Sequence, residues 1–227
     1  KANAPVAYGG TKLFDGNRDY LMQIPEEFAN TLVYFQDKFE ERPINFLEIG
    51  TASNLTNTMF WNNLNIANNV IVDALLCPNV EKSLVGNLSF KDGTVFIIGD
   101  STGEKVKRQV SSLGLEYDIV FCDGNHDYEY VKKDYEFYSQ MVKVGGYFVF
   151  HDIDNDKMPG VRRFIEECDF DGFENSVNFK VTGNENTCGI GIYSILFHKY
   201  FERCIGMDIN PNNIKIGKKL KEINNIK

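Results

Sequence analysis

Short, uninterrupted apolar runs recur along the middle of this chain, and longer polar or amphipathic segments separate them. The runs lie at 44–49, 70–72, 95–98, 119–121 and 147–150. Continuous runs of this length are typical of strands that are buried on both faces, as in a parallel sheet covered by helices. The segments between the runs, 51–66, 79–88, 102–114 and 127–143, are long enough to be crossover helices. The alternation predicts one doubly wound, Rossmann-like α/β domain.

The pattern differs before this alternation. Residues 1–24 are polar and rich in glycine, which predicts an arm or a lid. From Pro25 onward apolar residues recur at helical spacing, and Glu26 and Glu27 stand in the first turn, where the helix dipole favours acids. We expect this helix to end before Pro43.

The pattern changes again after Asp152. A helix is predicted at 161–168, followed by two strand-like runs at 177–181 and 190–196 that a turn-rich segment, 183–186, joins. Sequential strands with a short connection pair antiparallel. The expected fold is therefore a mostly parallel seven-stranded sheet with a C-terminal antiparallel hairpin.

The composition excludes several classes of protein. The chain has 227 residues, with 24 Lys and Arg against 32 Asp and Glu, and this formal charge of −8 disfavours a nucleic-acid-binding surface. No apolar run reaches the roughly 18 residues of a membrane helix, and the first residues form no secretory signal. The five cysteines include no C-x-x-C motif. We expect a cytoplasmic protein without nucleic-acid or membrane partners, with one domain at 25–198 and a Lys- and Asn-rich tail at 199–227.

Acidic residues stand at or just after the end of each predicted parallel strand. They are Glu48, Asp73, Asp100, Asp123 and Asp152. Ligands of open α/β sheets bind beyond the carboxyl ends of the strands. Gathering acids at one edge raises their pKa values and costs stability. Each acid alone could cap a helix, but together they favour a ligand site at that edge.

A glycine turn follows the first of these strands. Gly50 allows a ligand to approach the backbone over a helix N-terminus, and a carboxylate such as Asp73 can accept two hydrogen bonds from a ribose diol. The G-x-G-x-x-G motif of dinucleotide-binding folds is missing from the sequence, as is the lysine of a P-loop. Glu48 instead indicates a ligand that carries positive charge near this turn.

Three segments carry a resemblance to a known family. The segment FLEIGT (46–51) resembles the first motif of class I S-adenosylmethionine-dependent methyltransferases. The segments YDIVFCDGNHDY (117–128) and VGGYFVFHD (144–152) are similar to a narrower group, the metal-dependent small-molecule O-methyltransferases. That group includes macrolide-sugar O-methyltransferases, the cephalosporin-hydroxylase-like proteins and, more distantly, catechol O-methyltransferase. The resemblance covers about 44–196.

The resemblance implies a site for S-adenosylmethionine. The residues implied to bind it are Glu48, Gly50, Thr51, Ala52, Ser53, Asp73, Gly99, Asp100, Ser101 and Asp123. The turn after the first strand would line the methionine end, Asp73 would hold the ribose, and residues 99–101 would lie beside the adenine. Asn54 departs from the family pattern, which has glycine there, although Asn tolerates the left-handed conformation better than most residues.

The resemblance also implies a divalent metal site and a base. Asp123 and Asp152 match metal ligands, and His151 stands where relatives have a second carboxylate or a residue that is not a ligand. Oxygen ligands suit Mg²⁺ or Mn²⁺, and a bound cation lowers the pKa of a coordinated hydroxyl. His126 matches the general base and, with Asp123, forms the expected catalytic pair. The alternative for His126 is a surface histidine that caps the helix beginning near Asp127.

These roles predict a metal-assisted O-methyltransferase that acts on a small-molecule hydroxyl. A sugar or glycoside is preferred to a catechol because the base position holds His rather than Lys. A nucleotide sugar is a further option if Arg162 or Arg163 meets an anionic group, although both could be ordinary helix-surface charges. Two alternatives stay open: a degenerate cofactor-binding module without turnover, and a metal-dependent oxidoreductase in which Asp123, His151 and Asp152 bind iron. Homo-oligomerisation stays open as well.

Overall fold

The computed structural model describes residues 23, 25–52, 55–75, 92–153, 155–168, 170, 173–179 and 193–198. Several sequence-based predictions lie outside these residues. They are most of the arm at 1–24, Ser53 and Asn54 of the cofactor turn, the helix at 79–88, the turn at 183–186 and the tail at 199–227.

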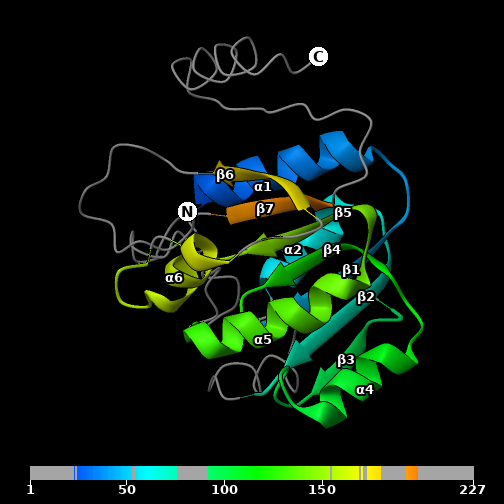
Figure 1. Cartoon of the computed structure of the whole chain (residues 1–227). Helices are drawn as coiled ribbons and strands as arrows, with labels where there is room; N and C mark the ends of the chain where they lie inside the picture. The colour runs from blue at the N-terminus through cyan, green and yellow to red at the C-terminus, as the bar shows by residue number, and fades with distance from the viewer. Residues whose placement is uncertain are drawn as a thin grey trace, which may run out of the picture.

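Strands and helices alternate through the described chain (Figure 1). The strands are β1 (Ile44–Ile49), β2 (Ile66–Asp73), β3 (Val95–Ile98), β4 (Tyr117–Cys122), β5 (Val142–Phe150), β6 (Phe173–Phe179) and β7 (Tyr193–His198). The helices are α1 (Pro25–Phe39), α2 (Leu55–Asn63), α4 (Glu104–Ser112), α5 (Tyr128–Tyr138) and α6 (Gly160–Glu167), with the 3-10 helix η2 (Ser139–Met141) after α5. Within the described ranges, no helix combines the length and the apolar character needed to cross a membrane.

The described strands pair in the order β3-β2-β1-β4-β5-β7-β6. The first five run parallel, and the strand order reverses between β1 and β4. β7 runs antiparallel to both β5 and β6. The five parallel strands and their helices confirm the predicted Rossmann-like α/β fold. The connection from β6 to β7 lies outside the described residues, so the hairpin and the total of seven strands stay predictions.

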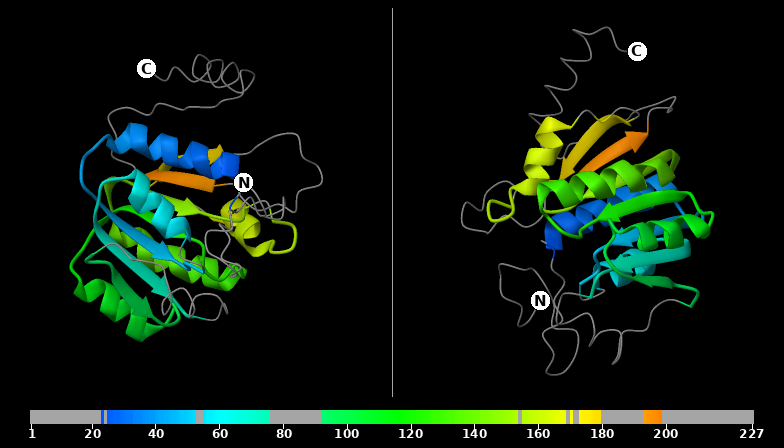
Figure 2. Two further views of the ribbon diagram at one scale, coloured as in Figure 1. Left: turned by 180° about the vertical axis from the view of Figure 1, so that it is seen from behind. Right: turned by 60° about the horizontal axis from the view of Figure 1, so that its bottom comes forward.

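Helices cover both faces of the parallel sheet, with α1 and α2 on one side and α4 and α5 on the other (Figure 2). Side chains alternate along each strand between two apolar clusters. Phe46 and Phe121 pack among the rings of α1 and α2, whereas Leu47 and Phe148 pack with the residues of α4, α5 and α6. Both faces of these strands are therefore buried. For this reason the sequence shows continuous apolar runs instead of an alternation of apolar and polar residues.

Some element boundaries differ from those that the apolar runs predict. β2 and β5 begin four to five residues before their apolar runs, because polar and glycine residues also join the sheet. Asn69, in β2, exchanges two side-chain hydrogen bonds with Asn57 of α2, at 3.1 and 2.8 Å. Asn68 donates to Asn45 of β1 at 2.7 Å. These hydrogen bonds satisfy the side-chain amides of Asn68 and Asn69, residues that on their own favour a loop, so the strand includes them.

Candidate active site

Gly50 brings the carboxyl ends of β1 and β4 together. Its φ of +79° lies in the left-handed region, and a Cβ at this position would lie 2.2 Å from the Asp123 carbonyl oxygen and 2.6 Å from Gly124 Cα. The Asp123 amide donates to the Ile49 carbonyl at 2.8 Å. Only glycine can hold this conformation at this distance, so Gly50 sets the position of Asp123.

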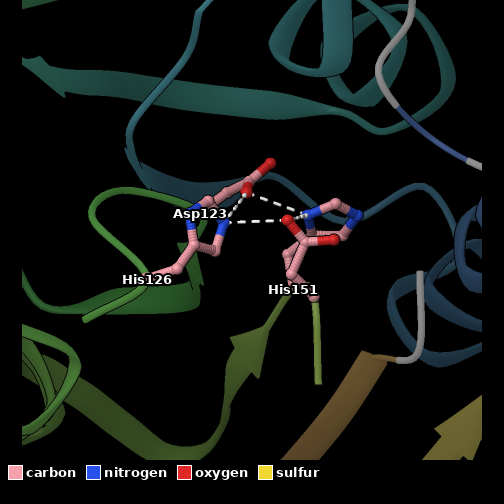
Figure 3. Close-up of side chains that lie close together, drawn as sticks. Asp123, His126 and His151 are labelled. Atoms are coloured by element: carbon pink, nitrogen blue, oxygen red, sulfur yellow. Dashed lines mark hydrogen bonds and ion pairs between the residues drawn. The ribbon is translucent and has the colours of Figure 1, made fainter. Parts of the chain in front are cut away.

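Four side chains converge just beyond β4 and β5 (Figure 3). Asp123 and His126 follow β4, and His151 and Asp152 follow β5; one ligand atom of each lies within 4.8 Å of the others. His126 Nε2 lies 2.8 Å from Asp152 Oδ2 and 3.4 Å from Asp123 Oδ1. His151 Nδ1 lies 2.8 Å from Asp123 Oδ1. The structure thus gathers the three predicted metal residues and adds His126 to them.

His126 does not cap α5. Asp127 is the N-cap residue of that helix, and its amide bonds to Asn125 Oδ1 at 2.9 Å. The His126 ring is turned toward Asp123 (Figure 3). The helix-cap alternative for His126 is therefore wrong, and its imidazole belongs to the cluster.

The cluster strongly shifts the pKa values of three of its members. Burial lowers the pKa of His126, but hydrogen bonding of its imidazole to the carboxylates of Asp123 and Asp152 outweighs burial and raises the pKa to about 9. Burial likewise lowers the pKa of His151, and the charge of Asp123 outweighs it and raises the pKa to about 10. Burial raises the pKa of Asp152, yet its bonds with both imidazoles hold that pKa well below its usual range. Opposite charges on the two imidazoles and on Asp152 therefore stabilise one another.

Asp152 shows two signs of a functional constraint. Its φ of +57° is left-handed, which is uncommon for a residue other than glycine. Its side-chain Oδ1 is buried and has no hydrogen-bond partner among the described residues. Strained residues of this kind cluster at functional sites. A buried oxygen without a partner, beside a second carboxylate and two imidazoles, fits a divalent cation, and the mixed oxygen and nitrogen donors suit Mn²⁺ as well as Mg²⁺.

Asp73, at the end of β2, holds the turn that follows β1. Its Oδ2 accepts the amides of Thr51 at 2.8 Å and Ala52 at 3.2 Å, and its Oδ1 accepts the amide of Leu75 at 2.6 Å. A carboxylate offers roughly four lone-pair positions. Among the bonds from described residues, these three leave Asp73 room for about one ribose hydroxyl.

Glu48, in β1, is 1% exposed at the same edge. Burial raises its pKa well above the usual value, hydrogen bonding from Thr51 opposes that rise, and the charge of Asp123 adds to it. Neither carboxylate oxygen has a well-aligned hydrogen bond within the described part of the chain. A cationic ligand at this position would favour the ionised form.

Gly99, Asp100 and Ser101 form the loop after β3. Asp100 Oδ1 accepts the amide and the hydroxyl of Thr102 at 2.9 and 2.8 Å, and the Ser101 carbonyl accepts the Tyr138 hydroxyl at 2.9 Å. These bonds fix the loop against α5, at the sheet edge that carries Asp73.

Gln23 reaches the cluster and was missed by sequence reasoning. It is fully buried, and its Nε2 donates to Asp123 Oδ2 at 3.3 Å and to Thr56 Oγ1 at 3.2 Å. A single glutamine in a polar segment carries no periodic signal, so only the structure could place it.

Asp134 is a second buried residue that sequence reasoning missed. It lies on α5 beside Ser101, is 0% exposed, and neither of its carboxylate oxygens has a well-aligned partner among the described residues. Burial raises its pKa to about 7. Its spacing from the apolar Val131 and Tyr138 places it on the buried face of the helix, and this spacing was the available signal.

A pocket of about 480 Å³ opens beside His126. Two loops line it, one before α5 and one before α6. The lining residues are Asn125, His126, Asp127, Tyr128, Lys157, Met158, Pro159, Gly160 and Arg163. A Cβ on Gly160 would lie 2.3 Å from the His126 carbonyl oxygen, so the start of α6 packs directly on the loop that carries His126.

Comparisons with known proteins give one family and one fold. Residues 47–153 match a family model described as a methyltransferase domain. The chain is 30% identical over 159 residues to an uncharacterized protein of Acanthamoeba polyphaga mimivirus, and the alignment covers 63% of this chain and 66% of that protein.

Two methyltransferases are among the solved structures that are similar to this one. The O-methyltransferase from Bacillus cereus in complex with SAH has a TM-score of 0.56 and 15% identity over 77% of this chain and 81% of that chain. The MycE methyltransferase from the mycinamycin biosynthetic pathway, in complex with Mg, SAH and mycinamycin VI, has a TM-score of 0.50 and 15% identity over 79% of this chain and 51% of that chain. At these identities the structures establish a common fold.

Proposed function

We propose that this chain, whose residues 47–153 match a methyltransferase domain, uses S-adenosylmethionine to methylate a hydroxyl oxygen of a small molecule, a sugar or glycoside, with the help of a divalent cation. The observation that carries this proposal is the convergence of Asp123, His126, His151 and Asp152 beside the turn at Gly50. The Mg in the MycE complex supports the metal, and the Bacillus cereus enzyme supports oxygen as the acceptor atom.

The turn after β1 holds the cofactor in this proposal. S-adenosylmethionine supplies an electrophilic methyl group on a positively charged sulfur. The residues that would surround it are Glu48, Gly50, Thr51, Ala52, Ser53, Asp73, Gly99, Asp100, Ser101 and Asp123. The buried carboxylate of Glu48 provides negative charge for a cationic ligand, and Gly50 allows close approach to the backbone.

Asp123, His151 and Asp152 hold the divalent cation, Mg²⁺ or Mn²⁺. A cation there would lower the pKa of the acceptor hydroxyl and orient it. Gln23 keeps Asp123 in place through its bond to Oδ2.

His126 accepts the hydroxyl proton at Nε2. While Asp123 and Asp152 are its partners, the pKa of about 9 keeps the imidazole protonated at neutral pH, and a protonated imidazole is no base. A cation held by both carboxylates would withdraw their charge from the imidazolium, so the pKa of His126 would be lower and its Nε2 could accept the proton.

The test is methyl transfer from isotopically labelled S-adenosylmethionine to a panel of sugars, glycosides and catechols. The protein is first stripped of metal and then assayed with and without Mg²⁺ or Mn²⁺. We expect label in a sugar or glycoside only when metal is present. We also expect His126→Ala to lose at least about 100-fold in rate while it still binds S-adenosylmethionine.

Asp123→Asn tests the cluster, because it removes one of the proposed metal ligands. Its matched control is Asp37→Asn, which makes the same substitution at an exposed position on α1. The control should keep full metal-dependent activity and Asp123→Asn should lose its response to metal. Methylation of catechols alone would contradict the sugar acceptor. Cofactor binding without transfer to any acceptor would favour a binding module.

A further inference from the structure

The pocket beside His126 combines an apolar wall with two cationic side chains. Met158, which is 43% exposed, and the ring of Tyr128 supply apolar surface, and Lys157 and Arg163 supply positive charge. The described lining contains a single acid, Asp127. In a chain with a formal charge of −8, a net cationic pocket is a local exception.

Arg163 is held in place at the rim of this pocket. Its guanidinium carbon lies 4.4 Å from the centre of the Tyr128 ring, and its Nε bonds to Glu167 at 2.9 Å. The guanidinium has five N–H donors, and the bond to Glu167 uses the one on Nε. Stacking on the ring and a bond at Nε orient the planar group, and an oriented guanidinium is suited to paired bonds with phosphate or carboxylate oxygens.

The start of α6 adds to the positive character of the same wall. Pro159 and Gly160 line the pocket at the N-terminus of this helix, where the helix dipole favours negative charge. The volume of about 480 Å³ lies within the range of small-molecule sites. His126 is among the residues that line the pocket, so the cationic side chains lie near the loop that carries the imidazole.

We propose that the acceptor carries an anionic group, a phosphate or a carboxylate, which Lys157 and Arg163 bind while the hydroxyl to be methylated lies at His126. The inference rests on the proposed function, because it takes this pocket as the acceptor site. Phosphate and carboxylate share a set of negatively charged oxygens, tetrahedral in one and planar in the other. The experiment below distinguishes a phosphate from a carboxylate.

The test measures binding of three related probes by calorimetry to the full chain loaded with SAH and Mn²⁺. The probes are glucose 6-phosphate, glucuronate and glucose. We expect at least one anionic probe to bind about 10-fold or more tightly than glucose, since a hydrogen bond to a charged group is worth about 1.5–3 kcal/mol. The Lys157→Ala/Arg163→Ala double variant should lose this preference, and Arg163→Lys should lose part of it because the charge stays and the paired bonds do not.

The control is the Lys133→Ala/Arg108→Ala double variant, which removes the same two charges from exposed positions on α5 and α4 outside the pocket. It should keep the wild-type preference. Equal binding of all three probes, no binding of either anionic probe, or a preference that survives in the Lys157→Ala/Arg163→Ala variant would overturn the proposal. A separate titration measures the binding of SAH alone. Failure of SAH to bind would count against the proposed function, so this outcome is distinguishable from a failure of the anion proposal.

Discussion

Gly50 is the residue on which the geometry of the site depends most. Alanine at this position meets two penalties, the left-handed φ of +79° and the backbone of Asp123 and Gly124 within 2.2 to 2.7 Å of the new Cβ. Gly114 is a matched control, because its φ of +61° is also left-handed but nothing lies within 4 Å of a Cβ.

We predict that Gly114→Ala lowers the free energy of unfolding by about 1–2 kcal/mol, the cost of the left-handed conformation. Gly50→Ala should cost at least about 2 kcal/mol more and should weaken binding of SAH. Urea denaturation and calorimetry measure the two effects. Equal losses in the two variants would show that the close approach to Asp123 is not a constraint.

Asp134 predicts a dependence of stability on pH. Its folded pKa of about 7 lies above the ordinary aspartate pKa of 3.8, so the folded state binds more protons between these pH values. The contribution of Asp134 to stability therefore falls as the pH rises from about 4 to about 7. The shift corresponds to a loss of up to about 4 kcal/mol, and Asp134→Asn removes this dependence.

Urea denaturation of the wild type and of Asp134→Asn at pH 5 and pH 8 checks this prediction. The stability of the variant relative to the wild type should increase between the two pH values. Asp37→Asn, at an exposed position, should show no such change. A relative stability of Asp134→Asn that is the same at both pH values would contradict the buried, protonated carboxyl.

At the scale of single residues, the sequence predicts the positions of the acidic site residues better than it predicts the side chains that contact them. Asp123 and Asp152 follow apolar runs, and the carboxyl ends of parallel strands share one edge, so their meeting is a consequence of topology. The His126 ring meets Asp152, whose backbone is left-handed, and Gln23 bonds to Asp123, which is 100 residues away in the sequence. Neither leaves a local pattern in the sequence.

At the scale of elements, asparagines explain why β2 is longer than its apolar run. Asn57 of α2 and Asn69 of β2 each donate to the other's carbonyl oxygen, and Asn69 also donates to Thr94 at 3.1 Å. The chain contains 24 asparagines, and in a linear pattern such residues indicate loops. Here hydrogen bonds to residues elsewhere in the fold override that preference for loops. A pattern in a single sequence does not contain such contacts.

We predict that the two amides behave as one unit. Asn57→Ala and Asn69→Ala should each cost about 1–3 kcal/mol, because each leaves a buried amide without its partner. The double variant should cost less than the sum by about 1 kcal/mol or more. Unfolding free energies from a double-mutant cycle give this coupling energy. Strictly additive losses would contradict the prediction, because they would mean that the two amides stabilise the fold independently.

Across the whole molecule, the chain order of the parallel strands sets the position of the site. The strand order reverses between β1 and β4, and the crevice at such a reversal is where open α/β sheets bind ligands. Gly50 and Asp123 stand at this point. The alternation of apolar runs predicted a site at the carboxyl ends of the strands, but the place where the strand order reverses is known only from the structure. The pocket at the start of α6 could not be predicted, because it needs the packing of Gly160 on the loop of His126.

The most direct test of the metal site and its link to the cofactor turn is a titration of Mn²⁺ into the SAH-loaded protein. We predict one Mn²⁺ per chain in the wild type, at least about 10-fold weaker binding in Asp152→Asn, and unchanged binding in the exposed Asp156→Asn. SAH should bind all three proteins. Wild-type Mn²⁺ affinity in Asp152→Asn, or no Mn²⁺ bound by the wild type, would contradict a divalent cation held by Asp123, His151 and Asp152.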